Sequence, residues 1–429
     1  MKKSNQHQFE YEFGGPIGAF LNIILLPICV LLFTELSANG DLSSTVEKLI
    51  AQDDESKTYL QNIFCPSCSD IATLCTCFSI IVFWFIYQIV LQQFLPADIV
   101  DGTLLRDDKT RLKYRINGHV TFWVTILTLP IMQHLDYGYD IYSELALVTI
   151  VLSCALSICL YTSSFCGNKL LAEPGNSGNI FYDFFMGREL NPRFGNFDWK
   201  EFCELRPGLL GWMLLNICMA MKQYKLHGAI TGSMILINIF QGFYVWDALY
   251  NEKAILTTMD ITTDGFGFML VFGDLAWVPF MYSIQARYLV YNDPHLSMIS
   301  LGGIVALHFF GYWIFRSANG QKNDFRSNPD ASNLKHLKYL QTKRGTKLLV
   351  SGWWGWARKI NYTGDWIMGL SWCLLCGVDS IVPYFYAIYF AILLVHRAIR
   401  DDHACEKKYG DDWEEYKKIV KYRFVPGLF

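Results

Sequence analysis

The residues best suited to chemistry lie near the C-terminal end of the sequence, in the segment HRAIRDDHACEKKYGDDWEEY. If this segment is helical, Arg397, Asp401 and Cys405 recur every four residues and form one stripe, with Tyr409 just beyond it. An arginine and an aspartate at this spacing usually form a modest structural ion pair. This pair, however, lies at the end of an apolar span, where burying a charged group away from water costs free energy. We therefore interpret the stripe as part of a functional site.

The upstream segment GYWIFRSANGQKNDFRSNP, residues 311–329, is a second source of charged groups. It leaves an apolar span at Arg316 and then presents Lys322 and Arg326. The planar guanidinium of arginine suits a phosphate group, and lysine acts as a point charge. A belt of basic residues at the membrane interface is the alternative interpretation. The sequence leaves both open.

A third segment, LLVSGWWGWARKINYTGDW at 348–366, combines glycines with closely spaced tryptophans. The glycines let the backbone approach a ligand or another helix, and Asn361 and Tyr362 offer directional hydrogen bonds. Trp and Tyr also mark membrane interfaces in many proteins. The density of Gly and Asn among the aromatic residues favours contact with a ligand over an ordinary interfacial belt.

The fourth segment, QGFYVWDALYNEKAILTTMDITTDGFGFMLVFGD, places Tyr244 close to several acidic residues in apolar surroundings. These acids are Asp247, Glu252, Asp260, Asp264 and Asp274. Burial keeps a carboxyl group protonated, which suits a proton donor. Hydrogen bonding between membrane helices is the alternative role for such groups.

These segments must be positioned by membrane helices. The 429 residues are 52% hydrophobic and only 17% charged, whereas a soluble domain is about 25% charged. The net charge of −3 argues against a nucleic-acid partner, which needs a basic surface. Because a bilayer-spanning helix needs about 20 apolar residues, the sequence predicts an all-α polytopic membrane protein with ten transmembrane helices and polar cytoplasmic loops. The predicted spans lie near 16–34, 72–93, 119–135, 143–163, 207–222, 227–249, 266–290, 298–315, 365–378 and 381–396.

Charge asymmetry between loops predicts how these helices are oriented. Lys and Arg gather in loops 106–115, 169–206 and 317–347, whereas loop 35–70 is acidic. By the positive-inside rule, both termini and the long polar loops then face the cytoplasm.

Several common cofactor motifs are absent from the sequence. It contains no G-x-G-x-x-G fingerprint, no phosphate-binding P-loop and no H-E-x-x-H pair, so we expect neither a Rossmann domain nor a metal. A nicotinamide cofactor would have to meet basic residues brought together from the loops. Cys65 and Cys68 have the spacing of a redox or metal motif, but a single pair is a weak signal and we prefer an ordered loop.

Long motifs in consistent order resemble the membrane sterol reductases along nearly the whole chain. They include EFGGPIG, LPADIVDGTLLRDDKTRLKYRINGH and GNSGNIFYDFFMGRELNPRFGNFDWKEFCELRPGLLGW. The segment ILTTMDITTDGFGFMLVFGDLAWVPFMYSIQ is most similar to the delta-14-sterol reductases and to the membrane domain of the lamin B receptor. One departure is WARKINYTGD, where Lys359 and Ile360 replace the His and Pro of close relatives. This departure bears on substrate specificity, because it could loosen the bend before Asn361.

The resemblance implies NADPH-dependent reduction of a sterol carbon–carbon double bond, the delta-14 bond in particular, by proton addition and hydride transfer. Because the sequence shows no internal repeat and no low-complexity stretch, we interpret it as one multi-helix membrane domain, 1–429. We assign N-terminal helices and loops to 1–206, and a catalytic half that holds the sterol and NADPH pockets to 207–429. Tyr244 would lie near the sterol, and Tyr244 or Asp401 would supply the proton. The implied NADPH pocket consists of Lys322, Arg326, Leu348, Trp354, Asn361, Tyr362, Arg397, Asp401, Cys405 and Tyr409.

Three alternatives stay open at this point. The reduced bond could be the delta-7 bond or a side-chain bond of the sterol. A membrane methyltransferase that uses S-adenosylmethionine has a similar Arg-rich and Tyr-rich C-terminal segment. A non-catalytic sterol-binding scaffold would consume no NADPH. The sequence leaves open the oligomeric state and whether the host membrane is the bacterial inner membrane or the endoplasmic reticulum.

Overall fold

The structure is a computed structural model that describes residues 9–51, 54–64, 70–105 and 110–427. It is mostly helical, and contacts divide it into two compact units, Met1–Asn292 and Asp293–Phe429. Three two-stranded antiparallel sheets lie in the loops, so the predicted helical fold is right and the loops add short strands that the sequence analysis did not anticipate. Cys65 and Cys68 lie outside the described residues.

Six helices among the described residues are long and apolar enough to cross a membrane, so the protein is a multi-pass membrane protein and the predicted number of ten is not confirmed. They are Gly15–Ala38, Ile71–Phe94, Tyr142–Ser163, Phe268–Leu289, Met298–Ser327 and Val382–Tyr409. Two other predicted spans form short helices, α5 (Gly118–Thr128) and α18 (Ile360–Leu374). The remaining two, α10 (Pro207–His227) and α11 (Gly232–Tyr250), are long enough but carry polar residues such as Lys222 and Asp247.

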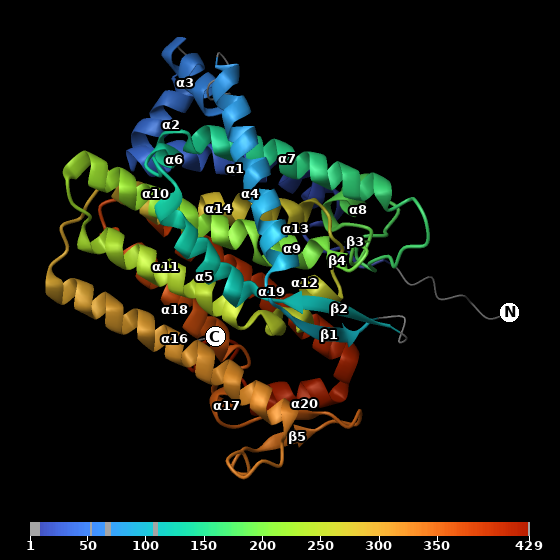
Figure 1. Cartoon of the computed structure of the whole chain (residues 1–429). Coiled ribbons are helices and arrows are strands. Elements are labelled where there is room, and N and C mark those ends of the chain that lie inside the picture. The colour runs from blue at the N-terminus through green and yellow to red at the C-terminus, as the bar shows by residue number, and fades with distance from the viewer. Residues whose placement is uncertain (1–8, 52–53, 65–69, 106–109, 428–429) are drawn as a thin grey trace. The chain divides into compact units, whose positions relative to one another are not determined.

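The first unit consists mainly of helices, which are joined by turns, loops and short strand pairs (Figure 1). Its other helices are α1 (Gly15–Asn39), α2 (Leu42–Ile50), α3 (Asp54–Phe64), α4 (Ile71–Phe94), α6 (Tyr137–Asp140), α7 (Tyr142–Ser163), α8 (Ile180–Met186), α9 (Trp199–Leu205) and α12 (Met259–Thr262), with 3-10 turns η1 (Leu129–Ile131) and η2 (Glu252–Thr257). Helix ends follow local chemistry: Asp198 caps α9 by accepting from the Lys200 and Glu201 N–H groups, and α10 starts at Pro207 and ends at the left-handed Gly228.

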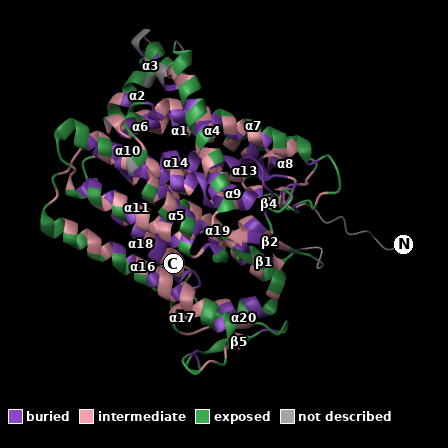
Figure 2. Ribbon diagram, viewed as in Figure 1, coloured by how far each residue is buried: buried purple, intermediate pink, exposed green. Residues whose placement is uncertain are grey.

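One interrupted helix forms the centre of the first unit. It runs through α13 (Phe268–Phe272), the π-helical turn η3 (Gly273–Trp277), α14 (Val278–Met281) and α15 (Ile284–Leu289). In its most apolar 18-residue stretch 67% of the residues are buried, against 22% in the corresponding stretch of α4. Figure 2 shows α13 and α14 largely in the colour of buried residues. The outer helices therefore expose apolar side chains, as helices surrounded by lipid do.

The glycines at the start of this central segment have a packing role. Gly187, at φ 85°, lies against the backbone of 265–267, and a Cβ on Gly265 would come within 1.8 Å of the Gly187 carbonyl oxygen. Two backbones can approach this closely only where neither residue has a side chain. The glycines of TDGFGF thus allow two backbone segments to pack closely.

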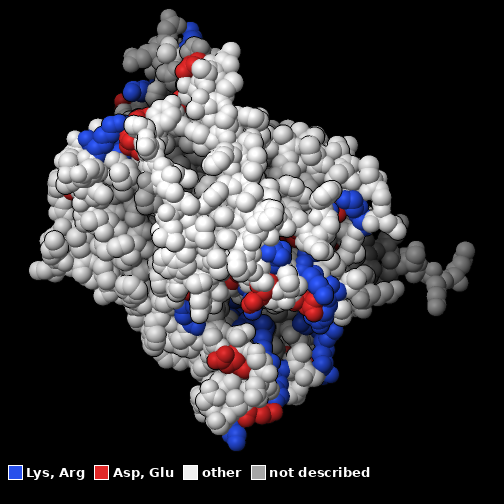
Figure 3. All heavy atoms as spheres, in the orientation of Figure 1, with Lys and Arg blue, Asp and Glu red and all other residues white. Residues whose placement is uncertain are grey.

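The short strands carry charged residues at the ends of the helices. β1 (Asp98–Leu104) pairs with β2 (Arg111–Ile116), β3 (Arg193–Phe194) with β4 (Phe197–Asp198), and β5 (Tyr339–Gln341) with β6 (Lys347–Leu349). In Figure 3 the visible helices of the first unit are almost free of charge along their length, and Lys and Arg gather around β1 and β2. This separation is the one that a bilayer requires.

The second unit is built on α16 (Met298–Ser327), α18 and α19 (Phe385–Tyr409), with α17 (Trp353–Trp356), η4 (Val382–Tyr384) and α20 (Asp411–Ile419) at their ends. α16 and α18 pack closely because both carry a glycine at the crossing, where a Cβ on Gly364 would lie 2.6 Å from the Gly311 carbonyl oxygen. The predicted helical pair at 365–378 and 381–396 corresponds to α18 and to η4 with α19.

Candidate functional site

A small cavity of about 100 Å³ lies in the second unit between the ends of α16 and α19, strand β6, α17 and α20. Seven of the ten predicted cofactor residues line it. They are Lys322, Arg326, Leu348, Trp354, Asp401, Cys405 and Tyr409. We call this the cationic pocket, because Lys347, Arg358 and Lys359 also line it and Asp401 is the one acid among its lining residues.

The floor of the cationic pocket holds a lysine against an aromatic ring. Lys322 Nζ lies 4.0 Å from the centre of the Trp354 ring. Trp354 is fixed in turn, because its Nε1 donates to the Ala318 carbonyl oxygen at 2.8 Å. A cation over an indole face is favoured, especially where water is excluded. The Nζ atom of Lys322 is therefore held in place against the indole ring.

Lys359 forms an ion pair with Asp401, in which its ammonium donates to the Asp401 carboxylate. Cys405 Sγ lies 3.9 Å from the same carboxylate oxygen. From the sequence, Lys359 stood out only as a departure from close relatives, and no site role was predicted for it. The signal that could have identified it is its charge, because it is a lysine within the segment already interpreted as contacting a ligand.

Residues 420–424 hold the start of α18 in place. Arg358 Nη1 donates to the carbonyl oxygens of Val420 and Lys421, at 2.8 and 2.9 Å. The Lys359 N–H donates to the Arg423 carbonyl oxygen at 2.8 Å, and Thr363 Oγ1 donates to that of Phe424 at 2.8 Å. Burial lowers the pKa of Arg358 from its ordinary value, with nearby Asp402 acting against the shift.

Three predicted cofactor residues do not line the cationic pocket. Asn361 Nδ2 donates to Asn319 Oδ1 at 3.2 Å, and the Tyr362 ring stacks on Phe424 with centres 6.4 Å apart. Arg397 lies on α19, one helical turn before Asp401. The structure thus brings seven of the predicted residues together at one cavity, and the other three lie outside its lining.

The cationic pocket also contains or adjoins polar atoms that the protein does not satisfy. Asn361 Oδ1, Arg358 Nε and Trp413 Nε1 are buried without a hydrogen-bond partner among the described residues. Buried polar groups are normally paired, so each such atom needs an explanation, and an absent ligand is one. Several cations, one acid and unpaired polar atoms beside aromatic rings are a donor set suited to phosphate groups.

Tyr244 lies in the first unit, on α11. Its ring centre is 6.1 Å from that of the buried Trp212 on α10. Trp212 Nε1 and Asn216 Nδ2 both donate to Gln241 Oε1, at 3.1 and 2.6 Å. A buried polar network therefore fixes the helix face beside Tyr244, which suits a residue that must hold one orientation.

One acid of the fourth segment, Glu252, has a structural role. Glu252 accepts from Arg206 Nη2 and from the Gly118 N–H, the latter at 2.7 Å. Arg206 also lies 3.6 Å from Glu201, whose other oxygen accepts from Gln92 Nε2 at 2.8 Å. Lys200 Nζ donates to the backbone carbonyls of Asp260, Ile261 and Asp264. These contacts tie α9 and η2 together.

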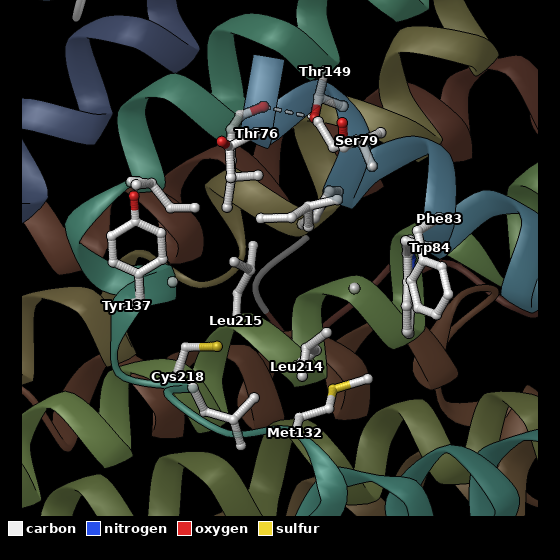
Figure 4. A pocket seen from close by; sticks show the side chains of 18 of the residues that line it. Thr76, Ser79, Phe83, Trp84, Met132, Tyr137, Thr149, Leu214, Leu215 and Cys218 are labelled. Atoms are coloured by element: carbon white, nitrogen blue, oxygen red, sulfur yellow. Dashed lines mark hydrogen bonds between the residues drawn. The ribbon is translucent and has the colours of Figure 1, made fainter. Parts of the chain in front are cut away.

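A much larger cavity, of about 740 Å³, lies in the first unit between α4, α7, α10 and the turn that joins α5 to α6 (Figure 4). Its lining is mostly apolar and does not include Tyr244. We call it the apolar cavity. Neither its size nor its position was predicted from the sequence.

Comparison with known proteins gives full-length matches. The sequence model of the "Ergosterol biosynthesis ERG4/ERG24 family" matches residues 7–429. The delta(14)-sterol reductase erg24 of Schizosaccharomyces pombe is 46% identical, over 99% of this chain and 98% of that protein. The delta(14)-sterol reductase TM7SF2 of Mus musculus is 43% identical over 100% of both chains. The delta(14)-sterol reductase LBR of Gallus gallus is 45% identical, over 99% of this chain and 65% of that longer protein.

Proposed function

The chain belongs to the ergosterol biosynthesis ERG4/ERG24 family, as its motifs predicted, and from this premise we propose that it reduces the delta-14 double bond of a sterol with NADPH. The full-length relatives are reductases, and the predicted enzyme class, an oxidoreductase acting on a carbon–carbon double bond, is confirmed by them. The names of these relatives are the basis for proposing the delta-14 bond in particular.

The observation that carries the cofactor proposal is the cationic pocket. Lys322, Arg326 and Lys359 line one small cavity with Trp354 and Tyr409. Cations at such a site would hold phosphate groups, and aromatic faces would hold planar rings. Asn361 and Arg397 would contact the same ligand from the rim. NADPH, when bound, supplies a hydride.

The proposed chemistry begins with a proton because an isolated carbon–carbon double bond is a poor hydride acceptor. Protonation at carbon 15 of the sterol places positive charge on the tertiary carbon 14, where hydride then adds. Tyr244 and Asp401 were both predicted as donors. We retain Tyr244 as the acid, because Asp401 is already the acceptor in its ion pair with Lys359. Aromatic faces near Tyr244 would stabilise the developing cation.

The orientation is part of the same proposal. Both termini and the basic loops would face the cytoplasm, where NADPH is available. The relatives come from a yeast, a bird and a mouse, which favours the endoplasmic reticulum over a bacterial inner membrane. The catalytic half would be 207–429, because it contains Tyr244 and every proposed cofactor residue.

Product analysis tests the proposal. Purified protein is incubated with NADPH and with sterols unsaturated at the delta-14 bond, the delta-7 bond or the side chain. We expect NADPH consumption and saturation of the delta-14 bond only. Reduction of another bond would change the substrate, and protection from unfolding by S-adenosylmethionine but not NADPH would indicate the methyltransferase. Sterol binding without NADPH consumption would indicate a scaffold.

The variant Tyr244→Phe tests the acid. It removes the hydroxyl proton and keeps the ring, so we expect unchanged NADPH affinity and a loss of turnover of about 10²-fold or more, the usual contribution of a positioned acid. Phe243→Tyr at the neighbouring position is the matched control, because it adds a hydroxyl group and leaves the proposed donor in place. Turnover close to that of the unaltered protein in Tyr244→Phe would exclude Tyr244 as the acid.

A further inference from the structure

The apolar cavity has two different ends. At one end a Cβ on Gly138 would lie 2.8 Å from Cys218 Sγ, so α6 and α10 meet there. At the other end Trp84 Nε1 donates to the Pro207 carbonyl oxygen at 3.0 Å, so α4 and α10 meet there. Figure 4 shows Tyr137 and Cys218 at one end and Trp84 at the other. The lining part of α10, from 207 to 218, rises about 16 Å at 1.5 Å per residue.

The walls of the apolar cavity present little unsatisfied polarity. The hydroxyl groups of Thr76, Ser79 and Thr149 each donate to a carbonyl of their own helix four residues earlier, at 2.7–2.9 Å. Leu275 and Phe280, both 5% exposed, show that the cavity reaches the buried central segment. Leu275 belongs to the π-helical turn, a local irregularity that is frequent at functional sites.

The rim at the Tyr137 end is polar. Gln133, His134 and Tyr137 line the cavity there and are exposed. The side chains of Gln133 and Tyr137 make no hydrogen bond with any described residue, so they are available to a ligand. A single polar end on an apolar chamber matches an amphiphile that carries one hydrogen-bonding group.

We propose that the apolar cavity binds a sterol, with its rings against α4 and α10 and its hydroxyl group at Gln133 and Tyr137. A volume of about 740 Å³ over so short a length makes the cavity wide, which fits a fused-ring lipid better than one extended acyl chain. The choice of sterol rests on the proposed function, because it is the lipid class that the relatives' names supply.

The position of this site separates it from the proposed chemistry. Tyr244 does not line the cavity, and Gly211, Leu214, Leu215 and Cys218 line it from a different face of α10 than Trp212, which contacts Tyr244. In the proposed orientation the rim at Gln133 and Tyr137 lies away from the cytoplasm. The site would therefore hold a sterol apart from the one being reduced.

Photolabelling of the full chain tests the proposal. A diazirine sterol with a free hydroxyl group is added to protein in nanodiscs without NADPH, and the labelled residues are mapped by mass spectrometry. We expect adducts in 75–85 and 132–138. Labels confined to other segments would overturn the proposal. A phospholipid probe that labels these segments and is not displaced by sterol would overturn it in favour of an acyl chain.

Cavity-filling variants sharpen the test. Gly211→Trp has room for its Cβ, since the nearest atom is Trp84 Nε1 at 3.6 Å, and the ring would fill the cavity. We expect labelling to fall about tenfold, a change of about 1.4 kcal/mol in binding, with the reductase turnover retained. Leu214→Trp provides the same test if Gly211→Trp fails to fold. Gly303→Trp, where a Cβ would meet nothing within 4 Å, is the matched control.

Two results separate this proposal from the proposed function. Unchanged labelling in both folded filling variants would overturn the apolar cavity as the sterol site and would leave the reduction untouched. Labelling at the expected residues in a protein that reduces no sterol would support the site and overturn the reduction.

Discussion

Two ion pairs among the described residues, Arg206 with Glu252 and Lys359 with Asp401, each join distant parts of the sequence and differ in their exposure. The side chains of the first pair are 0% and 1% exposed, and those of the second are 10% and 36% exposed. The partners of Arg206 and Glu252 all belong to the protein, whereas Lys359 and Asp401 face a cavity that contains further cations. We call Arg206–Glu252 the closed pair, because protein surrounds it and it can only stabilise the fold. We call Lys359–Asp401 the open pair, because it borders a cavity and can also contact a ligand.

The largest effect is expected from breaking the closed pair. Arg206→Met leaves Glu252 and Glu201 buried with their cation removed. Because loss of one partner strands a buried charge, we expect the free energy of unfolding to fall by about 3–5 kcal/mol. Thermal unfolding of the purified protein in detergent would measure it.

The matched control for this change is Lys253→Met. Lys253 lies 3.4 Å from Asp98, and both side chains are more than half exposed. An exposed pair contributes about 0–1 kcal/mol, so this variant should unfold at nearly the same temperature as the unaltered protein. Equal destabilisation by the two variants would contradict the distinction between closed and exposed pairs.

The open pair should affect the cofactor more than the fold. Lys359→Met removes one cation from the cationic pocket and leaves the Asp401 carboxylate facing the phosphates. We expect the Kd for NADPH to rise about tenfold, or about 1.4 kcal/mol, with little change in thermal unfolding. Fluorescence titration with NADPH would measure it, and Lys359→Arg should retain most of the affinity.

Lys343→Met is the control for the open pair, because Lys343 pairs with Asp411 at an exposed position near the same strands. It removes the same charge from the unit without touching the cationic pocket. If Lys343→Met and Lys359→Met weakened NADPH binding equally, general electrostatics would explain the effect and the assigned role of Lys359 would be wrong.

The smallest effect is a pH dependence from Glu201, the acid beside the closed pair. Burial raises the pKa of Glu201 above its ordinary value, and Glu252 adds to the shift while Arg206 opposes it. The folded protein then binds this proton more tightly than the unfolded chain does. The contribution to stability is therefore present below the ordinary glutamate pKa and is lost as the pH rises through the raised value, by at most about 1.4 kcal/mol per pH unit.

Glu201→Gln should flatten this slope, because an amide does not titrate. Thermal unfolding from acidic to neutral pH, compared between the variant and the unaltered protein, would show the difference. An identical slope in both proteins would mean that Glu201 does not carry a raised pKa.

Much of the second unit could be predicted from local sequence. Arg326 and Lys322 lie one turn apart at the end of α16, and Asp401, Cys405 and Tyr409 share one face of α19, so helical spacing alone brings them together. Asn361 and Tyr362 were harder to place, because residues 420–424 determine the local arrangement there. No local sequence pattern predicts a contact between 358–363 and 420–424.

The first unit was harder to predict for two physical reasons. The span predicted at 119–135 forms the short helix α5, which ends before it is long enough to cross a membrane, so hydropathy overstates its length. The apolar cavity is formed by faces of α4, α7 and α10 that read as ordinary apolar stripes. A stripe that packs against a neighbour and one that borders a void have the same sequence signature.

The hydrogen bonds from 358–363 to the backbone of 420–424 also constrain the order of events during synthesis. Lys359 and Thr363 leave the ribosome some sixty residues before their partners. The helices of the second unit can enter the bilayer in that interval, but this wall of the cationic pocket cannot form until residue 424 has been added. A nascent chain shorter than this should therefore be membrane-inserted and yet unable to retain the dinucleotide.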